Sequence, residues 1–253
     1  MNNDLQKAGM WKRAAAWMFD AIMVCVLVVG LGFLLSGVLG YDDANAALDA
    51  GYARYESQYG VTFDIPQSEY LAMTEAEQAN YNAAYEAMVA DTEVLYHYNM
   101  VLNLTLVIIS LSILISIMLW DFVIPLWLGN GQSLGKKIFS LGLVRPDGVM
   151  VNTMQLFVRT LLGKFTIETM IPVYILLMLF WGTLDLTGTL MLLVLLVAQA
   201  LCMILTSTNS AIHDLLAGTA VVDISSQTIF RSTEDLIAHQ KRVAAERAAR
   251  QTY

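Results

Sequence analysis

The chain has few of the residues that stabilise or activate ordinary soluble proteins. Only 14% of its 253 residues are charged, whereas soluble domains carry about 25%. It has two cysteines and three histidines. Both cysteines, Cys25 and Cys202, lie inside apolar runs. A disulfide framework and a thiolate metal site are therefore not predicted.

Motifs that carry covalent or metal-assisted catalysis are also missing. The sequence has no His-Glu-x-x-His, no Cys-x-x-Cys and no nucleophile elbow. The glycines between Gly131 and Lys136 lack the spacing of a phosphate-binding loop. The sequence thus predicts a protein that is not an enzyme, holds no cofactor and has no nucleic-acid partner.

Apolar residues are abundant instead. They make up 57% of the chain, and the mean hydropathy is +0.57. Four apolar runs approach or exceed the ~20 residues that cross a bilayer, and they lie at 14–39, 99–128, 165–182 and 188–206. The last two are joined by a short link and should form a hairpin. The predicted fold is an all-α membrane protein with four transmembrane helices in contact with a lipid bilayer.

The first apolar run begins after basic residues, as a signal peptide does. Its apolar region is much longer than the usual ~7–15 residues and contains Asp20. We therefore expect it to stay in the protein as a transmembrane helix.

Basic residues are distributed very unevenly. Of the 14 lysines and arginines, all but Arg54 lie in 1–13, 129–164 and 207–253. The positive-inside rule therefore predicts that both termini and the central loop are cytoplasmic.

The segment 41–98 has almost no basic residues and eleven acidic ones. It is too long for a structureless loop in a compact protein. We predict an extracytoplasmic acidic helical insertion of two helices joined through 61–68, the second running into the second span. Thr74 and Glu77 have the spacing of a capping box. The insertion could attract cations or a partner, or it could be only a solvated cap.

Two similar sequence patterns, each a short helix followed by a glycine and a strand, come after the second and fourth spans. In 129–164 a glycine-rich and basic stretch predicts a short helix, a stop at Gly142 and a strand at 143–145. After the fourth span, 212–217 predicts a short helix ended by Gly218 and a strand at 219–223. We expect the two strands to pair in a small cytoplasmic layer. The predicted parts are 1–40, 41–98, 99–128, 129–164, 165–206, 207–231 and a charged C-terminal helix at 232–253.

Three acidic residues lie inside predicted spans. Asp20 is roughly 9 Å of helical rise past Ala14, and Asp121 should lie at a similar depth from the end of the second span. Asp121 and Glu168 each precede a proline by four residues, which should leave their own main-chain carbonyls unbonded. Carboxylates beside such carbonyls hold cations in several transporters, so these three acids are a candidate ion-binding site.

A purely structural role for the same acids is an equal alternative. Arg13, Arg159, Lys164 and His213 approach the same leaflet and could neutralise them as a fixed network of ion pairs. Arg13 is seven residues before Asp20, on the same helical face. His213 has no second histidine or cysteine nearby, so a metal site is not predicted.

Four of these features together resemble the RDD family of bacterial membrane proteins. They are Arg13 with Asp20, the stretch 131–136, Arg159, and the stretch 213–219. The family is named for one arginine and two aspartates, and Asp214 matches the second aspartate. The resemblance covers about 8–40 and 120–223. The acidic insertion is larger than the family's usual connection, and 208–210 lacks the basic residues that often precede the family's His-Asp pair.

The resemblance implies a multi-pass protein of the bacterial cytoplasmic membrane with suggested transport roles, including cation–proton exchange. Two functions remain open. One is a transporter or exchanger of small cations or protons that uses Asp20, Asp121 and Glu168. The other is a non-enzymatic scaffold or regulator that binds a membrane-protein partner.

Overall fold

The computed structural model describes residues 8–129, 131–206, 208–226 and 228–251. These described residues are 78% helical, with four candidate membrane-spanning helices and a small two-stranded sheet. This confirms the predicted all-α membrane fold. Residues 1–7 and 252–253, the ends of the predicted N-terminal segment and C-terminal helix, lie outside the described residues.

The four long helices correspond to the four predicted spans, with different ends. The first is α1 (Met10–Val38) and the last is α10 (Leu186–Leu205). The second is continuous through α5 (Thr92–Ile117), η1 (Met118–Val123) and α6 (Ile124–Leu128). The third runs through α8 (Thr153–Val158), η2 (Arg159–Met170) and α9 (Ile171–Phe180).

The third helix begins well before the predicted residue 165. Asn152 caps it by accepting a hydrogen bond from the main-chain N–H of Gln155 at 2.7 Å, and Gln155 Oε1 accepts one from the main-chain N–H of Asn152 at 3.2 Å. The sequence prediction missed this start because polar residues and two cations, Arg159 and Lys164, interrupt the apolar pattern. These cations are therefore part of a spanning helix and not of a loop.

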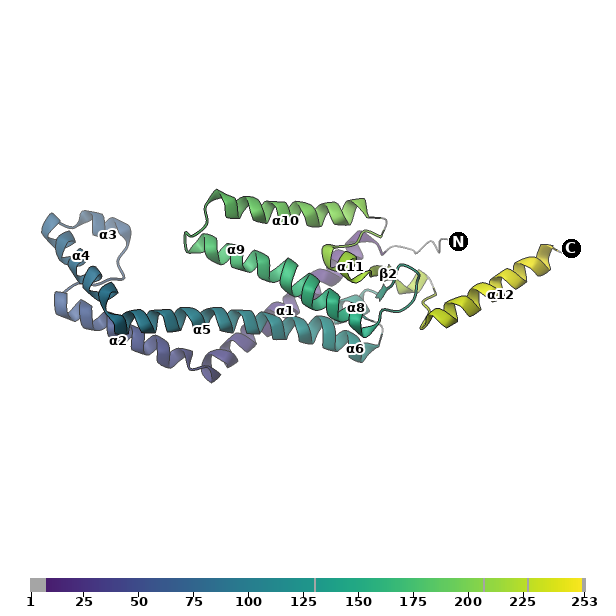
Figure 1. The fold of residues 1–253 in the computed structure, drawn as a ribbon, viewed down its shortest axis with the longest axis horizontal. Coiled ribbons are helices and arrows are strands. Elements are labelled where there is room, and N and C mark those ends of the chain that lie inside the picture. Colours follow the sequence, from purple (N-terminus) through teal and green to yellow (C-terminus); the bar gives the residue numbers. More distant parts are fainter. Residues whose placement is uncertain (1–7, 130, 207, 227, 252–253) are drawn as a thin grey trace. The chain divides into compact units, whose positions relative to one another are not determined.

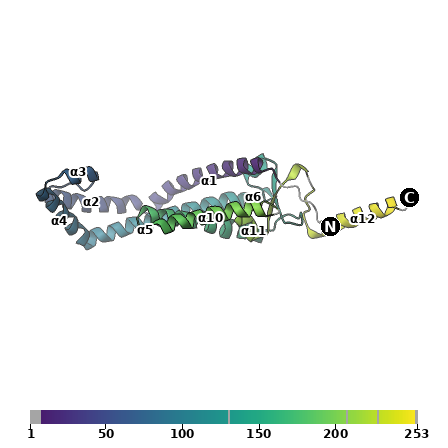
Figure 2. The ribbon, with the colours of Figure 1, turned by 90° about the horizontal axis from the view of Figure 1, so that it is seen from above.

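The chain divides into two compact units, 1–27 with 113–253, and 28–112. The first unit contains the helical hairpin of α9 and α10, which lie side by side (Figures 1 and 2). Asp185 begins α10 by accepting a hydrogen bond from the N–H of Thr187. This confirms the predicted hairpin.

A two-stranded antiparallel sheet completes the first unit. Strand β1 (Leu141–Val144) pairs with β2 (Ala220–Asp223), with Leu141 opposite Asp223. Each strand follows a short helix, α7 (Leu134–Ile138) or α11 (Ile212–Ala217). The pairing confirms the predicted strand layer. The sheet is followed by a 3₁₀ turn, η3 (Ile224–Ser226), and by the helix α12 (Thr233–Gln251).

Gly142 does not end the basic helix, contrary to the prediction. Helix α7 ends at Ile138, and Ser140 turns the chain with a φ of 56°. Gly142 lies inside β1, where an added Cβ would meet the side chain of Ile224 at 2.8 Å. The glycine is needed for this close approach and not for a turn.

The second unit holds the acidic segment as three helices and not two. They are α2 (Tyr41–Tyr59), α3 (Gln67–Ala72) and α4 (Glu75–Ala90), and Thr74 and Glu77 form the predicted capping box. Helix α4 does not run into the second span, because Asp91 is extended and separates it from α5. Leu48, Met88 and Val94 form a small core.

Candidate functional site

Two stretches of wide π-helix position the ionisable residues of the first unit. They are η1 and η2, and each ends within two residues of a proline, Pro125 or Pro172. A proline has no N–H and its ring clashes with the carbonyl four residues earlier. The helix must therefore change its hydrogen bonding at these places. π-Helical turns are often found at functional sites.

The carbonyl of Asp121 is not left without a donor, contrary to the prediction. The hydroxyl of Thr160, which is fully buried, donates a hydrogen bond to this carbonyl at 3.0 Å. The bond joins η2 to η1. The freed carbonyl therefore serves to hold two spanning helices together.

Asp20 is held by neutral donors and not by Arg13. Its Oδ1 accepts hydrogen bonds from Trp120 Nε1 at 2.8 Å and from the main-chain N–H of Gly135 at 2.9 Å. Its Oδ2 accepts from Ser133 Oγ at 2.5 Å. The side chain is buried, with the residue 5% exposed. Three helical elements, α1, η1 and α7, thus meet at one carboxylate.

Glycine at position 135 is required for this contact. A Cβ there would lie 2.5 Å from the carbonyl oxygen of Ala16 and 2.8 Å from Asp20 Oδ1. Any side chain would push α7 away from α1. Gly135 therefore allows α7 to pack closely against α1.

Lys136 is a buried cation beside Asp20. Its Nζ lies 3.1 Å from Ser133 Oγ, the same hydroxyl that donates to Asp20, and the residue is 8% exposed. Among the described residues, no carboxylate oxygen lies within 4 Å of this Nζ. Burial, together with the charges of Arg159 and Lys164, lowers the pKa of Lys136 to about 7. Its amine can therefore gain or lose a proton near neutral pH.

Asp121 has a dedicated partner in Lys164. The two form an ion pair between η1 and η2, and both side chains are largely shielded from solvent. Thr160 and Lys164 are one helical turn apart on η2, so the same face of η2 binds both the carbonyl and the carboxylate of Asp121.

Asp214 binds the two arginines of the site. Its Oδ1 accepts from Arg159 Nε at 2.8 Å, and its Oδ2 lies 3.8 Å from Arg13 Nη2. Arg13 also donates to the main-chain carbonyl of Thr208 at 3.4 Å. Both Asp214 and Arg159 are almost completely buried. The arginine charges lower the pKa of Asp214 far below its ordinary value, although burial alone would raise it.

Glu168 is bound to His213. Both of its carboxylate oxygens lie within 2.8 Å of His213 Nδ1, and Oε1 also accepts from the main-chain N–H of His213 at 3.1 Å. The close approach of α11 to η2 depends on Gly163, since a Cβ there would collide with the Cβ and Cα of His213. Burial lowers the pKa of His213, so the ring is neutral at neutral pH.

The structure thus gives each predicted acid its own partner. The predicted charge partners Arg13, Arg159, Lys164, His213 and Asp214 all belong to the network, and Lys136 adds a fourth strong base. Four carboxylates face four strong bases. Among the described residues, no three His, Cys, Asp or Glu side chains lie close enough to hold a metal ion. Asp20, Asp121 and Glu168 therefore do not form one ligand cage.

Sequence reasoning missed the neutral residues that complete the network. They are Trp120, Ser133, Thr160 and Thr219, whose hydroxyl donates to Asp214 Oδ1 at 3.1 Å. Their roles depend on contacts between residues far apart in the sequence, and polar uncharged side chains are common in any helix. One available signal was the position of Ser133 three residues before Lys136, which is the spacing of a helix N-cap.

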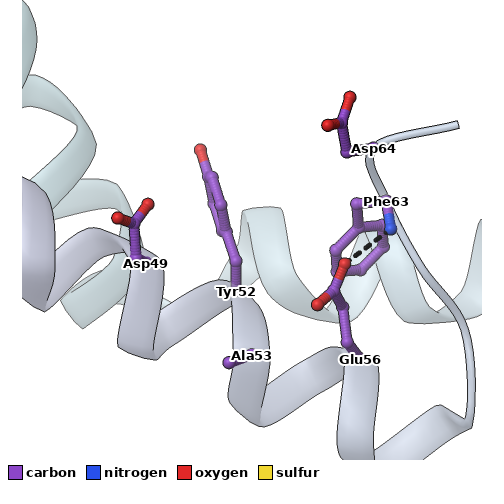
Figure 3. A pocket seen from close by; sticks show the side chains of 6 residues that line it. All are labelled: Asp49, Tyr52, Ala53, Glu56, Phe63 and Asp64. Atoms are coloured by element: carbon purple, nitrogen blue, oxygen red, sulfur yellow. Dashed lines mark hydrogen bonds between the residues drawn. The ribbon is translucent and has the colours of Figure 1, made fainter.

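The second unit has a separate pocket. A cavity of about 410 Å³ is lined by Tyr52, Ala53, Phe63 and the carboxylates of Asp49, Glu56 and Asp64 (Figure 3). Glu56 is oriented by a hydrogen bond from the main-chain N–H of Phe63 at 2.7 Å. The lining is aromatic and acidic and contains no basic residue.

A model of the RDD family matches residues 7–218. The chain belongs to the RDD family. The match includes every charged residue of the network described above, from Arg13 to Asp214. RDD proteins are membrane proteins, in agreement with the four long apolar helices. No curated protein and no solved structure matches the chain at a significant level.

Proposed function

We propose that this RDD-family protein exchanges small monovalent cations for protons across the cytoplasmic membrane of a bacterium. We further propose that it acts by transport and not as an enzyme. The observation that carries the proposal is the position of Lys136, a buried amine that titrates near neutral pH and shares the hydroxyl of Ser133 with Asp20.

Charge balance links the proton to the cation. With Lys136 protonated, the four strong bases balance Asp20, Asp121, Glu168 and Asp214. When Lys136 releases its proton, the buried network has one negative charge in excess. Uncompensated charge is expensive in a low-dielectric site, so the network then favours uptake of one cation. Proton release and cation uptake are thereby coupled one to one.

The oxygen atoms around Lys136 suit a monovalent ion. Ser133 Oγ and the carboxylate of Asp20 lie together at the end of α7, and the network offers no cage of three carboxylates or imidazoles among the described residues. Calcium sites gather about six to eight oxygen ligands, and magnesium requires near-ideal octahedral geometry. A single carboxylate with neutral oxygens fits a sodium or potassium ion better.

The proposed orientation follows from the basic residues. Those of 129–152 and of the segments next to the termini would lie in the cytoplasm, with the acidic segment 41–98 outside. The network would then lie in the cytoplasmic leaflet, where protons and cations reach it from inside the cell.

The test is proton flux in vesicles that contain the purified protein. We expect the wild type to move protons when sodium or potassium is added, and Asp20→Asn and Lys136→Met to abolish this movement. Lys137→Met should retain it, because Lys137 is the exposed neighbour of Lys136. Wild-type vesicles without sodium- or potassium-dependent proton flux over a broad pH range would contradict the proposal.

A second candidate function is a scaffold or regulator that binds a membrane-protein partner. Two observations favour it: each predicted acid already has a partner, and the second unit carries the acidic and aromatic pocket of Figure 3. Tyr52 and Phe63 could contact a basic side chain of such a partner while the carboxylates neutralise its charge. This candidate predicts no ion flux, and binding that is lost in Tyr52→Ala or Phe63→Ala.

A further inference from the structure

The two oxygens of the Asp214 carboxylate are used very differently. Oδ1 accepts hydrogen bonds from Arg159 and Thr219. Oδ2 is buried and has no hydrogen-bond donor among the described residues. His213 Nε2 lies 3.5 Å from this oxygen, and Arg13 Nη2 lies 3.8 Å from it. A buried acceptor without a donor is costly, and native structures contain few of them.

The hydrogen-bond partners of the neighbouring His213 ring determine which of its nitrogens carries the proton. Arg159 Nη2 lies 2.8 Å from His213 Nε2. A guanidinium group has only donors, so Nε2 must accept with its lone pair. The ring proton is then on Nδ1, which donates to Glu168 at 2.7 Å. In this arrangement the ring is neutral and both of its nitrogens are bonded.

We infer that His213 is a proton-binding site in which the added proton transfers the ring's Nε2 contact from Arg159 to Oδ2 of Asp214. The proton comes from water and binds the lone pair of Nε2, and no covalent bond is broken. A protonated Nε2 and the guanidinium of Arg159 are both donors, so their contact becomes repulsive. Oδ2 of Asp214 is the adjacent acceptor that has no donor.

The charged groups around the His213 ring balance one another, so together they do not stabilise the protonated ring. Arg159 and Glu168 face His213 from η2, Arg13 approaches from α1, and Asp214 is its neighbour on α11. These two cations and two anions balance, so a protonated ring leaves one buried positive charge in excess. Burial accordingly lowers the pKa of His213. Proton uptake should therefore need mildly acidic conditions.

Proton uptake would weaken the junction between α11 and η2. In the neutral state, Arg159 binds both residues of the His213–Asp214 pair, and Gly163 keeps the two elements in close contact. In the protonated state, Arg159 retains only its bond to Asp214. This inference is independent of the proposed cation exchange, because the ring can bind a proton whether or not a cation moves.

The test is a nitrogen NMR titration of a single-histidine protein. His97→Gln and His239→Gln leave His213 as the sole histidine of three. With ¹⁵N-labelled histidine in lipid nanodiscs, we expect the Nδ1–H tautomer at pH 8. We expect the ring to become protonated only below the ordinary histidine pKa of about 6.5. A ring that carries its proton on Nε2, or is charged at pH 8, would overturn the inference.

Matched variants test the role of Asp214. Asp214→Asn removes the charge that stabilises the protonated ring and should lower the pKa of His213 further. Asp223→Asn is the same chemical change on β2, where Asp223 binds Lys12, and should leave the titration unchanged. A folded Asp214→Asn protein with an unchanged titration would refute the transfer. If that variant does not fold, the tautomer and titration of the otherwise unaltered chain still decide the matter.

Discussion

The hydroxyl of Thr160 donates a hydrogen bond to the main-chain carbonyl of Asp121 across two spanning helices, at 3.0 Å. This is the carbonyl that Pro125 cannot bond, because proline has no N–H. Lys164, one turn further along η2, binds the carboxylate of the same aspartate. The carbonyl that lacks its usual helical donor in η1 is thus the acceptor that binds η2. Pro125 therefore determines where the two helices are joined.

This relationship predicts the effect of removing one hydroxyl. Thr160→Val keeps the shape of the side chain but leaves a buried carbonyl without this donor. It should lower the free energy of unfolding by about 1–3 kcal/mol, measured by thermal unfolding in detergent micelles. Thr160→Ser should be close to wild type. Thr166→Val is the matched control, since Thr166 is exposed and donates to Leu161 in its own helix. Equal losses at positions 160 and 166 would contradict the prediction.

The buried amine of Lys136 predicts a characteristic dependence of stability on pH. Its pKa is about 7 in the folded protein and 10.5 when exposed. Between these values the unfolded chain binds more protons, so the free energy of unfolding rises with pH. Lys136→Met should remove this rise, which amounts to at most about 5 kcal/mol, in unfolding curves measured from pH 7 to about pH 10. A Lys137→Met protein should keep it.

Gly163 predicts a packing failure. Alanine at this position would collide with the main chain of α11 at His213. Gly163→Ala should therefore destabilise the protein by about 1–3 kcal/mol or more. Gly37→Ala, on α1, is the control, because an added Cβ there meets nothing within 4 Å. Thermal unfolding that ranks the two variants equally would show that α11 can move away without cost.

The orientation in the membrane can be tested with single cysteines. In a Cys25→Ser, Cys202→Ser background, Ser57→Cys places a thiol on the exposed face of α2, and Ala245→Cys places one on α12. An impermeant maleimide added to intact cells should label position 57 and not position 245. Position 245 should become reactive only in inverted membranes. Labelling of both positions from one side would refute the four-span orientation.

The sequence was informative wherever a single segment decides the outcome. Four apolar runs specify four spanning helices. Inside a bilayer every main-chain N–H and C=O must be hydrogen-bonded within the protein, and an α-helix does this within one segment. The capping box at Thr74 and the glycine end of α11 at Gly218 were likewise visible. Both depend on residues that are close in the chain.

The third helix shows where such local reasoning fails. Its true start at Thr153 was hidden because Arg159 and Lys164 resemble loop residues in the sequence. They are tolerated in a spanning helix because Asp214 and Asp121 neutralise them. No property of 153–164 by itself reveals these partners.

The sequence by itself therefore determined that this chain is a four-span membrane protein of the RDD family with acids and bases inside its spans. Only the tertiary structure decided which of them pair. Asp20 is bound by Trp120, Ser133 and Gly135 and not by Arg13, and Arg13 lies beside Asp214. The physical reason is that pairing depends on which helices approach closely enough. Glycines and proline-induced changes of helical pitch set that approach through contacts between distant parts of the chain.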